Sequence, residues 1–313
     1  MKMIEVDALT VKYGKLRAVD RVSFSVFEQE IFGIVGPNGA GKTSTVECIG
    51  GLRRAYSGRV SVSGLDPWKN RQELYGVIGV QLQDTAYQDQ VRVGEICALF
   101  SSLYRNPALY GELLEIMQLS GKRRAFVSSL SGGERQKLAI VLALIPNPRI
   151  AFLDELTTGL DPHARHQMWD LLLKLRERGL TIVLVSHYMD EVEAVCDRVA
   201  IMNRGQMLTA GSITEVIDGF DLQTEISFRS SLEQTGELEK LPGVTSAKRR
   251  RNRITVQGRG DETVLAVLQY LKEQGAGCSG LAVKPPGLEA VFLNLVGYSP
   301  FEEGGQVEER GVR

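Results

Sequence analysis

The sequence lacks any long apolar run, and cysteine is scarce. No stretch approaches the roughly 18 consecutive apolar residues that indicate a membrane-spanning helix, and the first residues carry no apolar core of a secretion signal. The four cysteines lie far apart and form no CxxC pair, which argues against a zinc site or a disulfide framework. We therefore expect no transmembrane segment in this chain, and buried, reduced thiols at Cys48, Cys97, Cys196 and Cys278.

An excess of charge of either sign is also missing. The 313 residues include 37 Lys and Arg and 38 Asp and Glu, which gives a net charge of −1 at pH 7. No overall basic field favours a nucleic-acid partner, and no acidic excess predicts a long disordered tail. Hydrophobic residues make up 43% of the chain, which is ordinary for a globular protein, and the length predicts about two domains.

Residues 1 to about 220 alternate between strand-like and helix-like segments, which is typical of a mainly parallel α/β sheet. One continuous apolar run, 31–35, and two mostly apolar runs, 149–153 and 181–185, suit buried strands. A helix is expected over residues 162–177, with Asp161 as its N-cap and a proline at its first position.

Residues from about 85 to 145 lack this strand pattern. Apolar residues recur there at helical spacing, beginning with Ile96, Leu99, Phe100 and Leu103. We expect a helical subdomain inserted into the α/β core.

Residues 221–298 show a different pattern of predicted strands and helices. Its segments follow the order β-α-β-β-α-β of a small ferredoxin-like α+β unit, with one more helix at the end. The expected strands are 224–228, 244–250, 253–257 and 281–283, and the expected helices are 232–241, 262–274 and 288–296. Residues 299–313 are rich in glycine and charge, and we expect them to form a disordered tail.

A glycine-rich loop lies between the first apolar run and a predicted helix, and it matches G-x-x-x-x-G-K-[ST]. Its glycines let backbone N–H groups turn toward phosphate oxygens, and the following helix adds the positive end of its dipole. Lys42 is expected to reach the β- and γ-phosphates of a nucleotide, and the Thr43 hydroxyl to bind Mg²⁺. The residues expected to hold the nucleotide here are Gly36, Pro37, Asn38, Gly39, Ala40, Gly41, Lys42, Thr43 and Ser44.

Two acidic residues follow the second apolar run. Asp154 falls at the carboxyl end of that predicted strand, where open α/β sheets bind ligands, and we expect it to hold Mg²⁺ directly or through water. Glu155 is placed to polarise an attacking water, which makes it the candidate catalytic base.

The sequence Leu-Ser-Gly-Gly-Glu at 130–134 offers a serine hydroxyl and bare backbone N–H groups at the start of a predicted helix. With the preceding motifs and their order, it resembles the signature motif of the ATP-binding subunits of ATP-binding-cassette (ABC) transporters. The resemblance implies an α/β P-loop NTPase core that binds ATP and Mg²⁺. It further implies that Ser131, Gly132 and Gly133 cap the γ-phosphate of ATP bound to a second subunit, so that two ATP molecules lie inside a head-to-tail dimer.

Further positions match the family. Tyr13 matches the aromatic residue that stacks on adenine. Gln83 matches the catalytic-loop glutamine that senses Mg²⁺ and the membrane partner, with Gln81 as the alternative assignment. His187 matches the switch histidine that contacts the γ-phosphate, and Asp161 matches the loop that crosses the dimer interface.

The chain departs from the family at Leu156, where proline usually follows the catalytic glutamate. This change removes no catalytic group, so active hydrolysis is still expected. Residues 286–297 resemble the C-terminal end of ATPases in the drug- and antibiotic-export group. That resemblance implies a homodimer at the cytoplasmic face of the cell membrane, where it powers a separate ABC-2 type permease.

Two other functions remain open on the sequence alone. An importer ATPase shares every catalytic motif, and some ABC ATPases act on ribosomes or nucleic acid without a permease. The latter generally carry two cassettes in one chain, whereas one is found here. The basic cluster at 248–253 is either a solvated hairpin turn or a contact for anionic lipid or an acidic partner.

Overall fold

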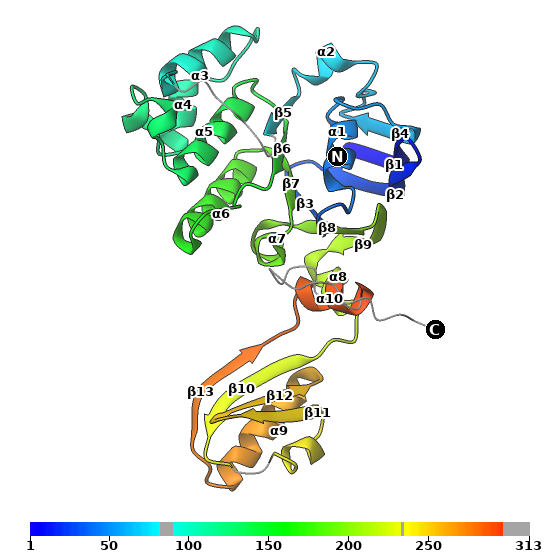
Figure 1. Ribbon diagram of the computed structural model, residues 1–313, viewed down its shortest axis with the longest axis vertical. Coiled ribbons are helices and arrows are strands. Elements are labelled where there is room, and N and C mark those ends of the chain that lie inside the picture. The colour runs from blue at the N-terminus through cyan, green and yellow to red at the C-terminus, as the bar shows by residue number, and fades with distance from the viewer. Residues whose placement is uncertain (82–89, 233–234, 297–313) are drawn as a thin grey trace. The chain divides into compact units, whose positions relative to one another are not determined.

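The computed structural model describes residues 1–81, 90–232 and 235–296, without the side chain of residue 261. These residues form two compact units, one ending at Ile213 and the other beginning at Thr214 (Figure 1). The α/β core, the inserted helices and the C-terminal α+β unit expected from the sequence are confirmed. No helix within the described ranges has the length and apolarity needed to cross a membrane.

The first unit is built on a six-stranded, mainly parallel sheet. Its inner strands are largely apolar, and every residue of β3, β6 and β7 is buried. All neighbouring pairs are parallel except the last, where β8 and β9 form an antiparallel hairpin. In spatial order the strands are β5 (Ile78–Gln81), β6 (Ile150–Asp154), β7 (Thr181–Ser186), β3 (Ile31–Val35), β8 (Arg198–Asn203) and β9 (Gln206–Ser212).

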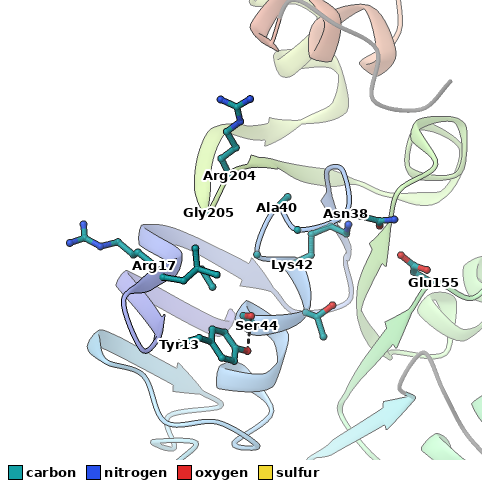
Figure 2. A pocket seen from close by; sticks show the side chains of 14 residues that line it. Tyr13, Arg17, Asn38, Ala40, Lys42, Ser44, Glu155, Arg204 and Gly205 are labelled. Carbon is teal, nitrogen blue, oxygen red and sulfur yellow. Dashed lines mark hydrogen bonds between the residues drawn. The ribbon is translucent and has the colours of Figure 1, made fainter. Parts of the chain in front are cut away.

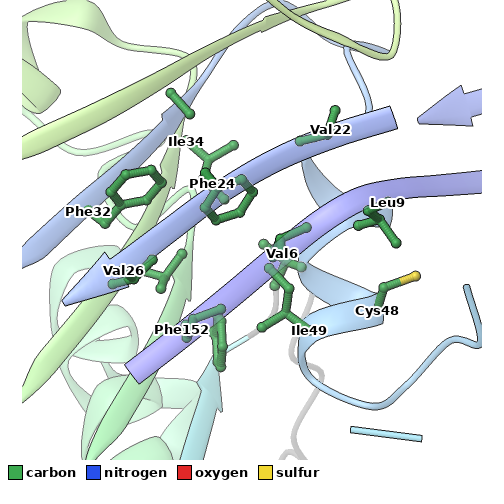
Figure 3. Packing of buried hydrophobic residues seen from close by; sticks show 14 of the residues in the cluster. Val6, Leu9, Val22, Phe24, Val26, Phe32, Ile34, Cys48, Ile49 and Phe152 are labelled. Atoms are coloured by element: carbon green, nitrogen blue, oxygen red, sulfur yellow. The ribbon is translucent and has the colours of Figure 1, made fainter. Parts of the chain in front are cut away.

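A second, antiparallel sheet completes the core of this unit. It contains β2 (Leu16–Phe27), β1 (Lys2–Tyr13) and β4 (Ser57–Val62), in that order. Apolar residues of both sheets and of helix α1 (Lys42–Ile49) form one buried cluster (Figure 3). Phe24 of β2 stacks on Phe32 of β3 with ring centroids 5.1 Å apart, which joins the two sheets directly. The phosphate-binding loop and α1 are therefore held by packing on two sides.

Helices make up most of the rest of the first unit. The inserted helical segment holds α3 (Val93–Ser102), α4 (Tyr110–Ile116) and α5 (Gly132–Leu144), which gather beside β5 and β6 in Figure 1. Helix α6 has the bounds expected from the sequence, and the Asp161 carboxylate caps it by accepting from Ala164 N–H at 3.0 Å. The other helices of this unit are α2 (Arg71–Leu74), α6 (Pro162–Glu177) and α7 (Met189–Val195), with 3₁₀ turns at Ser120–Lys122 and Val127–Ser129. Helix α8 (Ile213–Asp218) begins at the boundary between the two units.

The second unit is an antiparallel four-stranded sheet in the order β11-β12-β10-β13, with α9 packed on it. Strand β12 lies between β10 and β11, which is the split arrangement of a ferredoxin-like unit. Its elements are β10 (Thr224–Ser230), β11 (Val244–Arg250), β12 (Arg253–Gly258), α9 (Gly260–Glu273), β13 (Cys278–Lys284) and α10 (Leu288–Val296).

Two expectations for this unit were wrong. The helix expected over 232–241 is, in its described part, only a 3₁₀ turn at Leu238–Lys240. Gly236 weakens the helical run, and Pro242 follows directly after it. Leu238 is the fully buried residue of the segment, and Leu232 and Leu241 pack partly buried against the same core. Cys278 is exposed on β13, whereas the other three cysteines are buried as expected. The tail expected at 299–313 lies outside the described residues.

Candidate active site

The loop between β3 and α1 has a backbone that side chains would obstruct. Gly39 and Gly41 have φ angles of 79° and 97°, which residues with a Cβ rarely adopt. A Cβ at Gly41 would lie 2.4 Å from the carbonyl oxygen of Ala18. Helix α1 then begins at Lys42 with no side-chain cap, so its first N–H groups are left for a ligand at the positive end of the helix dipole.

The Lys42 side chain is folded into this loop and buried. Its ammonium donates to the carbonyl oxygens of Gly36 at 2.8 Å and Pro37 at 3.1 Å. Burial lowers the pKa of this ammonium, and the carboxyls of Glu155 and Asp154 oppose that change. A cation is thus held where the phosphates of a nucleotide would enter.

Asp154 ends strand β6 and is buried. Burial, and then the neighbouring Glu155 charge, raise its pKa to about 6, and Lys42 opposes this. Gln81, the alternative to Gln83 as the loop glutamine, is also buried, and its Oε1 accepts from the Asp154 backbone N–H at 2.9 Å. The Gln81 oxygen is therefore used inside the sheet, while Gln83 lies outside the described residues.

Glu155 and His187 form a pair at the ends of neighbouring strands. The Nδ1 atom of His187, directly after β7, lies 3.1 Å from Glu155 Oε1. Glu155 has a φ angle of 50°, the left-handed conformation, and its backbone N–H donates to the carbonyl oxygen of Val185 at 2.9 Å. Strained backbone of this kind persists where the surrounding structure fixes it, and it turns the Glu155 carboxyl out of the sheet toward the loop.

Tyr13, the last residue of β1, is held in a small network. Its hydroxyl lies 3.0 Å from Ser44 Oγ, as the dashed line in Figure 2 marks, and 3.4 Å from Glu47 Oε2. The guanidinium of Arg53 lies 4.3 Å from the Tyr13 ring centroid and pairs with Glu47 at 2.6 Å. The ring is therefore fixed before any ligand arrives.

Some of these groups line one pocket of about 710 Å³, whereas Asp154, Gln81 and His187 are not among its lining residues (Figure 2). Tyr13, Glu155 and the loop from Asn38 to Ser44 line it together. Sequence reasoning missed part of the lining: Leu16, Arg17, Ala18, Arg204 and Gly205.

The missed residues come from two hairpins of the first unit. Arg204 and Gly205, with φ angles of 47° and 78°, form the tight turn between β8 and β9. The Gly205 N–H donates to the Ala40 carbonyl at 3.0 Å, which ties this turn to the phosphate-binding loop. An Arg-Gly pair signals a turn in a sequence, but it does not reveal this long-range contact.

The signature segment lies elsewhere. Ser131 is the N-cap of α5: its hydroxyl accepts from Glu134 N–H at 3.3 Å, and Glu134 Oε2 accepts from Ser131 N–H at 2.9 Å. A Cβ at Gly132 would meet nothing within 4 Å, and one at Gly133 would lie 3.7 Å from Leu160. Ser131, Gly132, Gly133 and Asp161 are not among the residues that line the pocket.

Comparison with known proteins agrees with this geometry. The family model described as "ABC transporter" matches residues 19–158. The Nod factor export ATP-binding protein I of Rhizobium meliloti is 35% identical over 305 residues, covering 94% of this chain and 88% of that protein. The daunorubicin resistance ATP-binding protein DrrA3 of Streptomyces coeruleorubidus is 32% identical over 302 residues, covering 94% and 96%.

Solved structures match about two thirds of the chain. One, the ADP conformation of an ATP-binding cassette of an ABC transporter, aligns with a TM-score of 0.61 at 28% identity, covering 70% of this chain and 95% of that one. Another, a dimeric bacterial ABC transporter cassette, aligns with a TM-score of 0.60 at 26% identity, covering 67% and 98%. This chain is therefore a nucleotide-binding ATPase that belongs to the ABC transporter family.

Proposed function

We propose that this chain is the ATP-hydrolysing subunit of an exporter and powers a separate ABC-2 type permease at the cytoplasmic face of the membrane. The observation that supports this proposal is how much of the chain its similarity to export and resistance proteins covers. The solved cassettes cover about 70% of the chain, whereas the export and resistance ATP-binding proteins cover 94%, and so include the second unit. Residues 1–220 would be the ATP-binding domain and 221–298 an accessory domain. The export and resistance proteins therefore favour this function over an importer subunit or an ATPase acting on nucleic acid.

The pocket accounts for how the chain would hold ATP. Tyr13 is proposed to stack on the adenine. The uncapped start of α1 and the Lys42 ammonium would bind the β- and γ-phosphates, because each offers positive charge inside a loop of bare backbone. Since Lys42 donates only to neutral carbonyls here, a phosphate oxygen would be a stronger acceptor than either.

The residues also fit Mg²⁺, which binds oxygen ligands and usually needs only one or two from the protein. The Thr43 hydroxyl lines the pocket, and Asp154 is a buried carboxyl whose pKa is raised to about 6 by burial and the Glu155 charge. A nearby cation would favour its ionised form. The ion would neutralise phosphate charge, while Thr43, Asp154 and Gln83 are the proposed ligands.

Glu155 and His187 are proposed to serve the hydrolytic step. Glu155 would accept a proton from the attacking water, and the His187 ring, held 3.1 Å from its carboxylate, would orient that carboxylate and contact the γ-phosphate. The Glu155 carboxyl lines the pocket, which is the position that a base needs.

Two copies of the chain are proposed to act together. Ser131, Gly132 and Gly133 lie outside the pocket of their own chain, and the open space beside Gly132 leaves the start of α5 accessible to an anion. They would therefore cap ATP bound to the second copy, with Asp161 in the loop that crosses between the copies.

The test is the mass of purified Glu155→Gln protein in solution with and without Mg·ATP. Replacing the base should slow hydrolysis by at least about 100-fold, so a monomer should become a stable dimer only when Mg·ATP is present. Wild-type protein, which hydrolyses its ATP, is the matched control. If Glu155→Gln hydrolyses ATP at the wild-type rate, the assignment of Glu155 is wrong.

A further inference from the structure

Helix α7 carries a carboxylic acid that the proposed mechanism does not use. Glu191 is fully buried, although it lies in the first turn of a short helix that also carries exposed acidic residues. Buried carboxyls are rare unless they are hydrogen-bonded, so the contacts of this side chain indicate what it does.

The first contact leads to the turn that carries His187. Ser186 Oγ, at the end of β7, donates to Glu191 Oε2 at 2.5 Å and accepts from the Tyr188 backbone N–H at 3.0 Å. The serine hydroxyl therefore joins the residues on both sides of His187, and Glu191 fixes the direction in which that hydroxyl donates. The His187 ring, packed 4.0 Å from the Tyr188 ring, is presented to Glu155 from this turn.

The second contact leads to the segment after Glu155. Burial raises the pKa of the Glu191 carboxyl, and hydrogen-bonding groups of Ser186, Thr157 and Trp169 oppose the rise. Thr157 lies two residues after Glu155, at the start of the segment that leads to Asp161, and it is fully buried. Glu191 thus faces both chain segments that carry the Glu155–His187 pair.

This second contact is incomplete. Six buried side-chain atoms lack a hydrogen-bond partner in the described part of the chain. One is Oε1 of this carboxyl, and two others, Thr157 Oγ1 and Trp169 Nε1, belong to its neighbours. Leaving buried polar atoms unsatisfied is costly, so a small movement that brings Thr157 and Trp169 onto Oε1 would be favourable. The Ser186 side of the carboxyl is hydrogen-bonded, whereas the Thr157 side is not.

We propose that Glu191 is a positioning residue, which holds the His187 turn through Ser186 and so sets the geometry of the Glu155–His187 pair. The inference rests on the proposed function of that pair. It assigns no contact between Glu191 and ATP, because the carboxyl acts only through its neighbours. Misplacing reacting groups by about 1 Å can cost about 100-fold in rate, so losing this link should lower turnover without weakening ATP binding.

The test measures steady-state ATP hydrolysis by the full chain carrying Glu191→Ala, with Glu193→Ala, an exposed position on the same helix, as the control. The expected result is a fall in kcat of about 10- to 100-fold with KM for ATP unchanged within about twofold. The control should keep both values. Unchanged kcat in Glu191→Ala, or an equal loss in the control, would overturn the inference.

A double-mutant cycle separates positioning from general loosening of the fold. If Glu191 acts through His187, adding Glu191→Ala to His187→Ala should cost no further turnover, whereas independent losses would multiply. Should Glu191→Ala fail to fold, Ser186→Ala breaks the same link and should show the same lack of additivity. The positioning role is refuted if the losses in kcat of the two single variants multiply in the double variant, in whichever of the two cycles has variants that fold.

The same data distinguish this inference from the proposed function. Wild-type turnover in Glu155→Gln and His187→Ala would mean that the proposed hydrolytic pair is wrong. Lost turnover in those two variants, with wild-type turnover in Glu191→Ala and Ser186→Ala, would refute only the role of Glu191.

Discussion

Two helix starts in the first unit differ in how their backbone donors are used. Helix α1 begins without a side-chain cap, and the buried Lys42 ammonium lies beside it. Helix α5 begins with Ser131 and Glu134 capping one another, and Glu134 is paired with Lys122 at 3.0 Å. The first offers its donors to a ligand of its own chain, whereas at the second Ser131 already accepts from the Glu134 N–H, and the open space beside Gly132 is proposed for ATP bound to the second copy. The comparison teaches that glycine-rich helix starts are not equivalent phosphate sites.

The strongest way to break this comparison is a glycine-to-alanine change at each helix start. Gly41→Ala places a Cβ 2.4 Å from a backbone oxygen at a φ of 97°, so we expect a stability loss of about 2–4 kcal/mol and loss of ATP binding by more than about 100-fold. The Cβ added by Gly132→Ala meets nothing within 4 Å. This variant should leave stability and ATP binding nearly unchanged. Titration with a fluorescent ATP analogue and urea unfolding measure the two effects. Equal losses at both positions would remove the distinction.

Ser131→Arg sharpens the comparison by separating binding from turnover. A large cation at the start of α5 fills the space proposed for the partner's γ-phosphate, so hydrolysis should fall at least about 100-fold, as when a transition-state donor is removed. ATP affinity of the monomer should not change, because Ser131 lies outside its own pocket. Loss of monomer binding instead would mean that the segment belongs to the pocket of its own chain.

A smaller effect is expected when only the cap of α5 is removed. Ser131→Ala deletes the hydroxyl that accepts from Glu134 N–H, and such caps contribute about 1 kcal/mol. The free energy of unfolding should fall by that amount, while Ser131→Thr keeps an acceptor and serves as the control. No change in Ser131→Ala would show that the capping bond adds nothing to stability.

The smallest expected effect concerns the base-binding end of the α1 pocket. Arg53→Ala removes the guanidinium that lies over the Tyr13 ring, and a cation–π contact contributes about 0.5–1 kcal/mol. ATP affinity should weaken by about two- to fivefold with kcat unchanged. Arg53→Lys keeps the charge but not the planar contact, so its ATP affinity should lie between those of the wild type and Arg53→Ala. A change in kcat alone would contradict a role confined to binding.

Local patterns predicted much of the first unit from the sequence. The buried strands β3, β6 and β7 and helix α6 were found because continuous apolar runs, and Asp161 followed by Pro162, depend only on neighbouring residues. The phosphate-binding loop and Asp154–Glu155 were found for the same reason. The structure and the comparisons with known proteins confirm the fold class and the family, and the site roles remain predictions.

What the sequence did not predict depends on long-range contacts. Arg17 and Arg204 line the pocket because two hairpins, far apart in the chain, meet the phosphate-binding loop. Glu191 reads as a solvated acidic residue near a helix start, and only the packing of α7 buries it. The helix expected over 232–241 is replaced by a 3₁₀ turn, because Gly236 lies inside the segment and Pro242 follows directly after it.

The folded-back Lys42 side chain also bears on selectivity among nucleotides. Its two hydrogen bonds to Gly36 and Pro37 keep the charge solvated by the loop itself, so the loop does not depend on a ligand to stay open. A ligand must exchange those neutral acceptors for better ones, and only a chain of phosphates long enough to reach the ammonium offers them. Adenosine and AMP would leave the lysine bonded to Gly36 and Pro37. We therefore expect this side chain to discriminate nucleotides by the length of their phosphate chain.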